Sequence, residues 1–145
     1  LDGVEGWNRM YGSTGFIQYQ FVVPDGAAHL VPEIIEMFVR AKCPVFLSVL
    51  KRFGDQNSGL LSFPLKGWTL AVDVSASFYG LSELLDEMDS RVVNAGGRIY
   101  LSKDSRMNPY YLGSMYPRLN EFLAVKNRID PGRMFTSNLS LRLGL

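Results

Sequence analysis

The chain has 145 residues, which is enough for one compact domain with a proper core but not for two. Hydrophobic residues make up 47% and charged residues 20%, an ordinary globular composition that argues against disorder. With 15 Lys and Arg against 14 Asp and Glu, the net charge of +1 gives no broad electrostatic support for binding nucleic acid or an anionic membrane. No segment approaches the roughly 20 apolar residues of a transmembrane segment.

Cysteine and histidine are too scarce for several kinds of site. Cys43 is the only cysteine, so no intramolecular disulfide can form and a cytoplasmic, reducing location is expected, with peripheral membrane association left open. His29 is the only histidine, and one His with one Cys cannot build a four-ligand zinc site. Residue 1 is Leu rather than Met, which indicates a chain processed or cut from a longer one.

The first third of the chain predicts one strand and one helix. Residues 1–15 are rich in glycine and predict an irregular lead-in, whereas alternating β-branched and aromatic residues over 16–23 predict a strand. Apolar residues at helical spacing predict a helix in 30–41. Pro32 leaves two alternatives open: the helix starts near this proline, or Asp25 caps a bent helix.

The rest of the chain completes a recognisable order of elements. Strands are predicted over 45–53, 68–74 and 98–101, with an amphipathic helix over 81–94 between the last two. Asn108-Pro109 then opens a helical region that Pro117 breaks in two and Asp130-Pro131-Gly132 ends. The order βαββαβ followed by C-terminal helices predicts a single α+β domain, 1–145, with a ferredoxin-like antiparallel sheet and both helices on one face. The acidic residues of the second helix are expected to form a solvated face: Glu83, Asp86, Glu87 and Asp89.

Alternation along the predicted strands assigns the side chains to two faces. Ile17, Tyr19 and Phe21 are apolar and share one face of the first strand, which we expect to meet the helices. The other face carries a largely polar set: Gln18, Gln20, Thr69, Ala71, Asp73, Tyr100 and, near the end of the second strand, Lys51. Amides, a phenol and an ammonium group suit a polar ligand, but simple contact with water accounts for a polar face equally well.

Four segments in register resemble one family. They are the sequence GGRIYLSKDSR at 96–106 and the segments at 15–21, 64–68 and 125–131. Together they resemble the C-terminal substrate (cap) half of the FAD-linked oxidases of the vanillyl-alcohol oxidase superfamily. The resemblance is strongest to the decaprenylphosphoryl-ribose 2'-oxidase branch, with arabinono-lactone oxidases as more distant members.

The resemblance implies a two-domain flavoenzyme, in which an N-terminal domain of the same polypeptide holds FAD and this sheet covers the isoalloxazine ring. The implied reaction is oxidation of a secondary alcohol on a sugar or sugar-phosphate type of substrate, with hydride transfer to the flavin. This chain lacks the glycine-rich pyrophosphate loops of such an FAD domain. On its own it is therefore expected to be inactive and not to retain FAD tightly.

The resemblance also implies roles for individual residues. Lys103 is expected to interact with the substrate hydroxyl or the flavin, and Tyr100 to orient it, as the catalytic pair. Gln18 and Gln20 would hydrogen-bond sugar hydroxyls or the flavin edge. Lys51 either pairs with a phosphate on an activated sugar or is a solvated lysine at a strand end.

The third strand departs from the branch at two positions. Members commonly carry Asn and Cys two residues apart, where this chain has Thr69 and Ala71, so the pocket wall is smaller and less polar and the substrate is open. A competing hypothesis from another class is a free-standing ferredoxin-like module that binds a small molecule or dimerises through its open sheet. An isolated cap is also expected to form a homodimer through that sheet, and a third alternative is a scaffold domain without a ligand.

Overall fold

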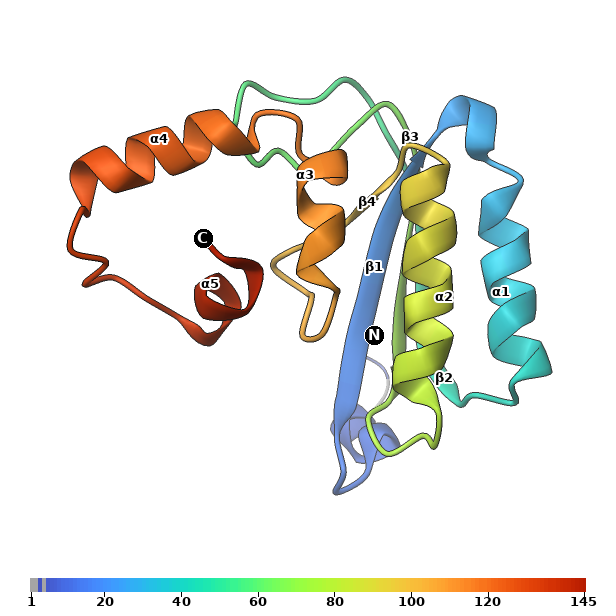
Figure 1. Cartoon of the computed structure of the whole chain (residues 1–145). Helices are drawn as coiled ribbons and strands as arrows, with labels where there is room; N and C mark the ends of the chain where they lie inside the picture. Colours follow the sequence, from blue (N-terminus) through green and yellow to red (C-terminus); the bar gives the residue numbers. More distant parts are fainter. Residues whose placement is uncertain (1–2, 4) are drawn as a thin grey trace.

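A four-stranded antiparallel sheet forms the centre of the fold in the computed structural model, which describes residue 3 and residues 5–145. The strands are β1 (Phe16–Pro24), β2 (Val45–Phe53), β3 (Gly67–Ser75) and β4 (Arg98–Ile99). Their order across the sheet is β2-β3-β1-β4, so the first and third strands are central (Figure 1). The predicted α+β fold with a ferredoxin-like βαββαβ order is thereby confirmed.

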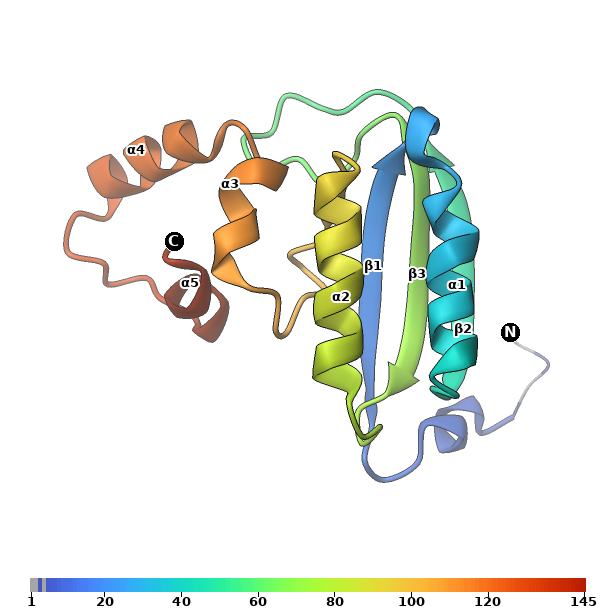
Figure 2. The same ribbon diagram turned by 45° about the vertical axis from the view of Figure 1, so that its right-hand side comes forward.

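Helices α1 (Leu30–Arg40) and α2 (Leu81–Asn94) both pack on one face of this sheet (Figure 2). The core between the two layers contains these buried side chains: Tyr19, Phe21, Val23, Ile34, Phe38, Leu70, Val72, Leu85, Met88, Val92 and Ile99. Burying one large apolar side chain contributes roughly 1.5–3 kcal/mol. This packing therefore fixes which sheet face is covered and leaves the opposite, more polar face open.

The start of α1 decides between the two alternatives that Pro32 leaves open. The helix begins at Leu30, so the proline lies in the first turn, where a backbone N–H has no partner within the helix. Asp25 does not cap α1, because it belongs to a separate 3-10 helix, η2 (Asp25–Ala27), and its carboxylate accepts a hydrogen bond from Arg52 at 2.9 Å. The helix therefore starts near the proline.

The predicted strand over 98–101 is wrong in its length, because β4 ends at Ile99. The Tyr100 N–H still donates to the Gln20 carbonyl oxygen at 2.9 Å, so pairing extends one residue beyond the strand. The Lys103 N–H then donates to the Tyr100 carbonyl oxygen at 3.0 Å, which turns the chain away from the sheet.

The segment before β1 is more ordered than its glycine content predicts. It contains a 3-10 helix, η1 (Trp7–Tyr11), and the buried Tyr11 ring stacks on Phe16 with 4.1 Å between ring centroids. Tyr11 also meets the edge of the Phe46 ring at 5.4 Å. These contacts hold η1 against one end of the sheet. Leu1 lies outside the described residues.

The C-terminal third forms short helices beyond the β4 edge of the sheet (Figure 1). They are η3 (Pro109–Tyr111), α3 (Leu112–Met115), α4 (Leu119–Ile129) and α5 (Asn138–Leu143). The break at Pro117 is confirmed, whereas α5 was not predicted and begins at a capping box between Ser137 and Ser140. Within the described part of the chain, no helix combines the length and apolar character needed to cross a bilayer.

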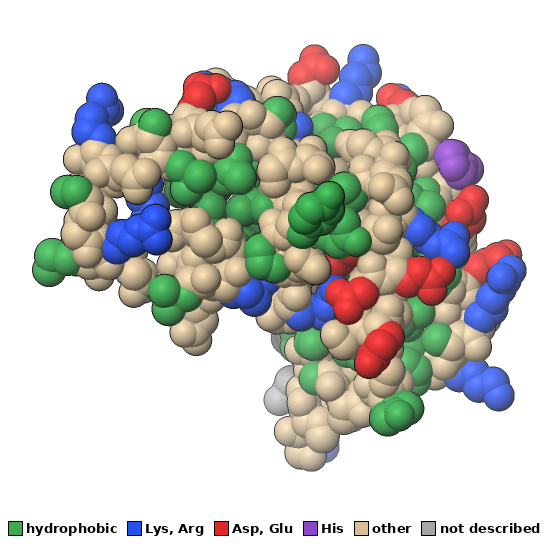
Figure 3. Space-filling view, in the orientation of Figure 1, with side chains coloured by type: hydrophobic (Ala, Val, Ile, Leu, Met, Phe, Trp, Pro, Cys, Tyr) green, Lys and Arg blue, Asp and Glu red, His purple; other side chains and the backbone are tan. Residues whose placement is uncertain are grey.

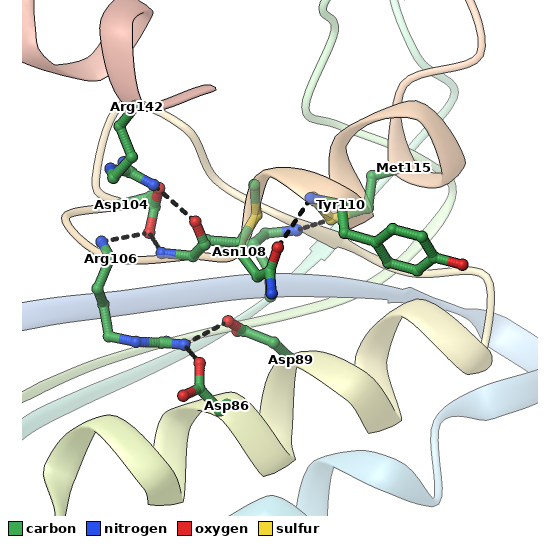
Figure 4. Close-up of polar contacts among 10 residues, drawn as sticks. Asp86, Asp89, Asp104, Arg106, Asn108, Tyr110, Met115 and Arg142 are labelled. Atoms are coloured by element: carbon green, nitrogen blue, oxygen red, sulfur yellow. Dashed lines mark hydrogen bonds and ion pairs between the residues drawn. The ribbon is translucent and has the colours of Figure 1, made fainter. Parts of the chain in front are cut away.

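A buried carboxylate ties the last helix to the loop after β4. Asp104 accepts hydrogen bonds from the backbone N–H groups of Arg106 at 3.0 Å and Met107 at 2.8 Å. Its second oxygen accepts from Arg142 of α5 at 2.6 Å, and Arg142 also donates to the Met107 carbonyl oxygen at 2.7 Å (Figure 4). The loop and α5 are therefore joined by charge-assisted hydrogen bonds, which are stronger than neutral ones.

The expectation of a wholly solvated acidic face on α2 is wrong for Asp89. Acidic side chains do gather on the surface over α2 (Figure 3), where Glu83, Asp86 and Glu87 are exposed. Asp89 instead has 0% exposure and accepts a hydrogen bond from Arg106 at 2.9 Å, and Arg106 also pairs with Asp86 (Figure 4). Among the described residues, no group of three or more His, Cys, Asp or Glu side chains converges as a metal site would require.

Candidate functional site

The sheet face opposite α1 and α2, here called the open face, carries the residues that alternation assigned to it. They are Gln18, Gln20, Lys51, Thr69, Ala71, Asp73 and Tyr100. The register places Gln20 opposite Ala71, Gln18 opposite Asp73, and Lys51 opposite Thr69. Tyr100 lies beside Gln20 through its backbone hydrogen bond. Six of the seven predicted site residues therefore share one face, and Lys103 follows on the turn after Tyr100.

Asp73 is a nearly buried carboxylate on the open face, with 3% of its surface exposed. One oxygen accepts a hydrogen bond from Gln18 Nε2 at 2.7 Å, and the other accepts from the Tyr11 hydroxyl at 2.9 Å. Burial, together with the hydrogen bond to Asp73, raises the pKa of Tyr11. The Tyr11 hydroxyl therefore keeps its proton and remains a donor to the carboxylate.

Thr69 is on the predicted face but has only 1% of its surface exposed. Its hydroxyl donates to the Phe21 carbonyl oxygen at 2.7 Å and accepts from Gln20 Nε2 at 3.1 Å. Thr69 thus lies beneath Gln20 and holds the amide of that residue. Ala71, directly opposite Gln20, is partly exposed, and its small side chain leaves space beside Gln20.

Two lysines provide positive charge at this site. Lys51 is exposed at the end of β2, and Lys103 is exposed on the turn after β4. Neither ammonium group has a side-chain hydrogen bond or ion pair with another described residue. Both groups are therefore available to an anionic or hydroxyl-bearing ligand.

Tyr100 stands at the border between the open face and a hollow. Its ring stacks on Phe63, with 4.3 Å between centroids and 20° between planes. The hollow has a volume of about 530 Å³ and lies between the loop that joins β2 to β3 and helix α4. Its lining includes Asn57, Leu60, Leu61, Phe63, Tyr100 and Phe122.

Arg98 fixes the loop that forms one wall of this hollow. Its guanidinium donates to the carbonyl oxygen of Ser62 at 2.6 Å and to the Gln56 side chain at 3.0 Å. The same group lies 5.7 Å from the centre of the Tyr116 ring, a cation–π distance. Arg98, a partly buried residue of β4, therefore fixes the second half of the loop, and Arg118 also donates to the Ser58 carbonyl oxygen at 2.8 Å.

Sequence reasoning placed Asp73 on the polar side of its strand but did not select it as a site residue, and it missed Tyr11 altogether. The signal for Asp73 is the pairing of a carboxylate directly opposite Gln18. That pairing depends on strand register, which alternation within single strands does not determine. Tyr11 lies in a segment without periodicity, so nothing in the local sequence indicates its contact with β3.

Comparison with known proteins adds a second line of evidence. No family model matches the chain. Over all 145 residues the chain is 43% identical to decaprenylphosphoryl-beta-D-ribose oxidase of Mycolicibacterium smegmatis, of which the match covers 31%. The similarity extends over the entire length of the chain. The predicted resemblance to the decaprenylphosphoryl-ribose oxidase branch is thereby confirmed.

A second relative is similar over the same residues. The chain is 37% identical to the protein called "Uncharacterized protein in mprA 5'region" from Streptomyces coelicolor, and the match covers 40% of that protein. The chain thus spans less than half the length of either curated relative. The similarity to the oxidase supports an oxidoreductase-related role.

Proposed function

We propose that this chain is the substrate-binding domain of an FAD-dependent oxidoreductase that oxidises a secondary alcohol of a sugar or sugar-phosphate type of substrate. An N-terminal domain of the same polypeptide would hold most of the FAD. The observation that carries the proposal is the 43% identity, over the whole chain, to an oxidase whose name specifies a phosphorylated ribose derivative. The polar open face supports it, because substrate contacts would come from this surface.

The open face fits a planar ring system with polar edges. Gln18 and Gln20 are half-buried amides two residues apart on β1, and Ala71 opposite Gln20 leaves no bulky side chain in the way. Amides offer both a donor and an acceptor, as the edge of an isoalloxazine ring requires. FAD, when bound, supplies the hydride acceptor, and Gln18 and Gln20 would hold its edge or the sugar hydroxyls.

Lys103 and Tyr100 are the proposed catalytic pair. A carbinol carbon gives up hydride more readily when its hydroxyl proton is removed or the charge on its oxygen is stabilised. The Lys103 ammonium group can supply that stabilisation, and its backbone bond to Tyr100 places the two residues in one turn. Lys51, at the opposite edge of the sheet, would pair with a phosphate on the sugar.

Replacing Lys103 tests this assignment. In the complete FAD-containing protein, Lys103→Ala should slow flavin reduction by roughly 10²–10⁴-fold, the usual range for a lost acid–base or charge-stabilising group. Stopped-flow absorbance of the flavin under single-turnover conditions measures that rate. The matched control is Arg40→Ala, which removes an exposed cation from α1 on the other side of the sheet.

An unchanged rate in Lys103→Ala would remove Lys103 from the mechanism. Absence of flavin reduction by any ribosyl phosphate in the unmodified protein would instead contradict the proposed class of substrate. The two results separate the role of one residue from the function of the domain.

A further inference from the structure

We propose that the open face is built to accept hydrogen bonds, and that Asp73 and Thr69 are the positioning residues that make it so. Each one holds a glutamine through its NH₂ group, so that the carbonyl oxygens of Gln18 and Gln20 remain for the ligand. Hydroxyl or N–H groups of a ligand can then donate to these two oxygens, while one N–H of each amide is already used on Asp73 or Thr69. The identification of this ligand as a polyhydroxylated sugar rests on the proposed function, whereas the amide orientation does not.

The orientation of Gln18 follows from the chemistry of Asp73. A carboxylate only accepts hydrogen bonds, and both of its oxygens are occupied, by Gln18 Nε2 and by the Tyr11 hydroxyl. Turning the amide by 180° would bring its carbonyl oxygen against a carboxylate oxygen without a hydrogen between them. Because Asp73 is almost fully buried, water cannot readily relieve that repulsion.

The orientation of Gln20 follows from the single hydroxyl hydrogen of Thr69. That hydrogen is used on the Phe21 carbonyl oxygen at 2.7 Å, so the Thr69 oxygen can only accept from Gln20. Thr69 is buried, which excludes exchange of this partner for water. The Gln20 NH₂ group is therefore turned toward Thr69.

The result is a pair of acceptors on one face of one strand. The carbonyl oxygens of Gln18 and Gln20 have no hydrogen-bond partner among the described residues. Residues two apart on a strand are separated by roughly 7 Å along it, which suits a ligand with donors at both ends of a ring. A site built to receive such donors strongly disfavours an analogue that lacks them.

Nuclear magnetic resonance on this chain tests the orientation directly. In each side-chain NH₂ group of Gln18 and Gln20, the proton bonded to Asp73 or Thr69 should exchange slowly with solvent, and a scalar coupling should join Gln18 Nε2 to the Asp73 carboxyl carbon. Thr69→Val should remove the protection of Gln20 alone, whereas Thr69→Ser, which keeps the hydroxyl, should retain it. Fast exchange of both groups in the unmodified chain would overturn the proposal.

Exchanging the carboxylate and the amide between positions 73 and 18 provides the control for Asp73. In Asp73→Asn the new amide can donate, so Gln18 can turn its NH₂ group outward and lose its protection. Adding Gln18→Glu to that variant restores an oxygen on the ligand side. Unchanged exchange of the backbone N–H groups of β1 and β3 in each variant shows that the fold is intact.

Two matched sugars test the ligand class. Methyl β-D-ribofuranoside should shift open-face resonances, and its fully O-methylated derivative, which keeps the oxygens but lacks donors, should bind at least tenfold more weakly. Asp73→Asn should weaken binding of the ribofuranoside by a similar factor, and the double variant Asp73→Asn, Gln18→Glu should restore that binding. Equal binding of both sugars, or no binding of the ribofuranoside, would overturn the ligand assignment.

The outcomes also separate this inference from the proposed function. Protected amides in a protein that never reduces flavin would contradict the proposed function and support the proposed orientation of the Gln18 and Gln20 amides. Flavin reduction together with freely exchanging amides would contradict the proposed amide orientation and support the proposed function.

Discussion

Asp89 is an acidic residue that the fold removes from water. It lies on α2 with 0% exposure, and its carboxylate accepts a hydrogen bond from Arg106 at 2.9 Å. Burial raises the pKa of Asp89 to about 6, and the Arg106 guanidinium opposes this rise without cancelling it. The charge on this residue therefore changes in mildly acidic solution, where an ordinary aspartate is already ionised.

This pKa predicts how stability depends on pH. An unfolded chain loses the Asp89 proton near pH 4, whereas the folded protein keeps it until about pH 6. Between these values the folded state binds more protons, so the free energy of unfolding should fall as pH rises and then level off. A shift of about 2 units sets the upper limit of the effect at about 3 kcal/mol.

Urea unfolding at intervals between pH 4 and pH 7 measures this effect. Asp86, Asp104 and Arg106 lie around Asp89 and also contribute to the profile, so the readout is the difference between the unmodified chain and Asp89→Asn. The difference should change across the pH 4–6 window, and Asp55→Asn, at an exposed loop position, should show no such change. Parallel profiles for Asp89→Asn and the unmodified chain would contradict the raised pKa.

At the scale of elements, two adjacent glycines join α2 to β4 for different reasons. Gly96 has φ of 74°, the left-handed conformation that ends a helix. At Gly97 the constraint is space, because an added Cβ would lie 2.5 Å from the Val22 carbonyl oxygen and 2.8 Å from Val92 Cγ1. The closest obstacle is backbone of the central strand β1, which cannot move aside as a flexible side chain can.

Gly97→Ala should therefore destabilise the protein by about 2 kcal/mol or more, the cost of overpacking at a rigid site. The midpoint of urea unfolding measures the loss. Gly113→Ala is the matched control, since it adds a methyl group where no atom lies within 4 Å, in helix α3, and should be neutral or stabilising. Equal midpoints for both variants would contradict the close contact at Gly97.

Most elements could be predicted because their patterns are local. Alternation defined β1 and β3, and helical spacing of apolar residues defined α1 and α2, so the order of elements and the open face followed. The shortness of β4 could not be predicted, because residues 98–101 alternate as a strand does and no glycine or proline marks the turn that the Lys103–Tyr100 backbone bond closes. Helix α5 was missed because its capping box pairs two serines in place of the usual serine and glutamate.

Residues whose roles depend on distant partners could not be assigned from the sequence. Asp89 reads as part of an acidic helix face, and its burial follows from Arg106, which reaches it from the loop after β4. Asp73 becomes a positioning residue only through the register that sets it opposite Gln18. Strand and helix periodicity carry no information on either pairing.

At the scale of the whole molecule, the C-terminal helices are attached to the sheet layer by apolar packing of Leu112, Met115 and Leu143 and by a few specific polar contacts. The Met115 sulfur accepts from the Ile99 N–H at 3.1 Å, and the Tyr116 hydroxyl donates to the Ile99 carbonyl oxygen at 2.7 Å. Helix α5 is held by Arg142 to Asp104 and Met107 (Figure 4). This last attachment should control local opening of the C-terminal segment.

Arg142→Gln should therefore loosen α5 without unfolding the sheet. The variant leaves the Asp104 carboxylate, which is 3% exposed on its side chain, without its cation, at a cost of roughly 1–3 kcal/mol. Hydrogen exchange in α5 should accelerate about 10–100-fold, while the backbone N–H groups of β1 and β3 keep their rates. Arg128→Gln, at an exposed position in α4, serves as the control, and equal α5 exchange in both variants would contradict this role of Arg142.

The central position of β1 has a consequence for the order of events during synthesis. This strand is made first, but its partners β3 and β4 begin only at Gly67 and Arg98. Contacts so distant in sequence require large loops to close before any stabilisation is gained, which slows folding. Val22 is fully buried in the finished fold and pairs with Arg98 of β4, so it lacks this neighbour in a nascent chain that has not yet reached β4. The hydrophobic strand β1 therefore needs protection from aggregation until β4 has been translated.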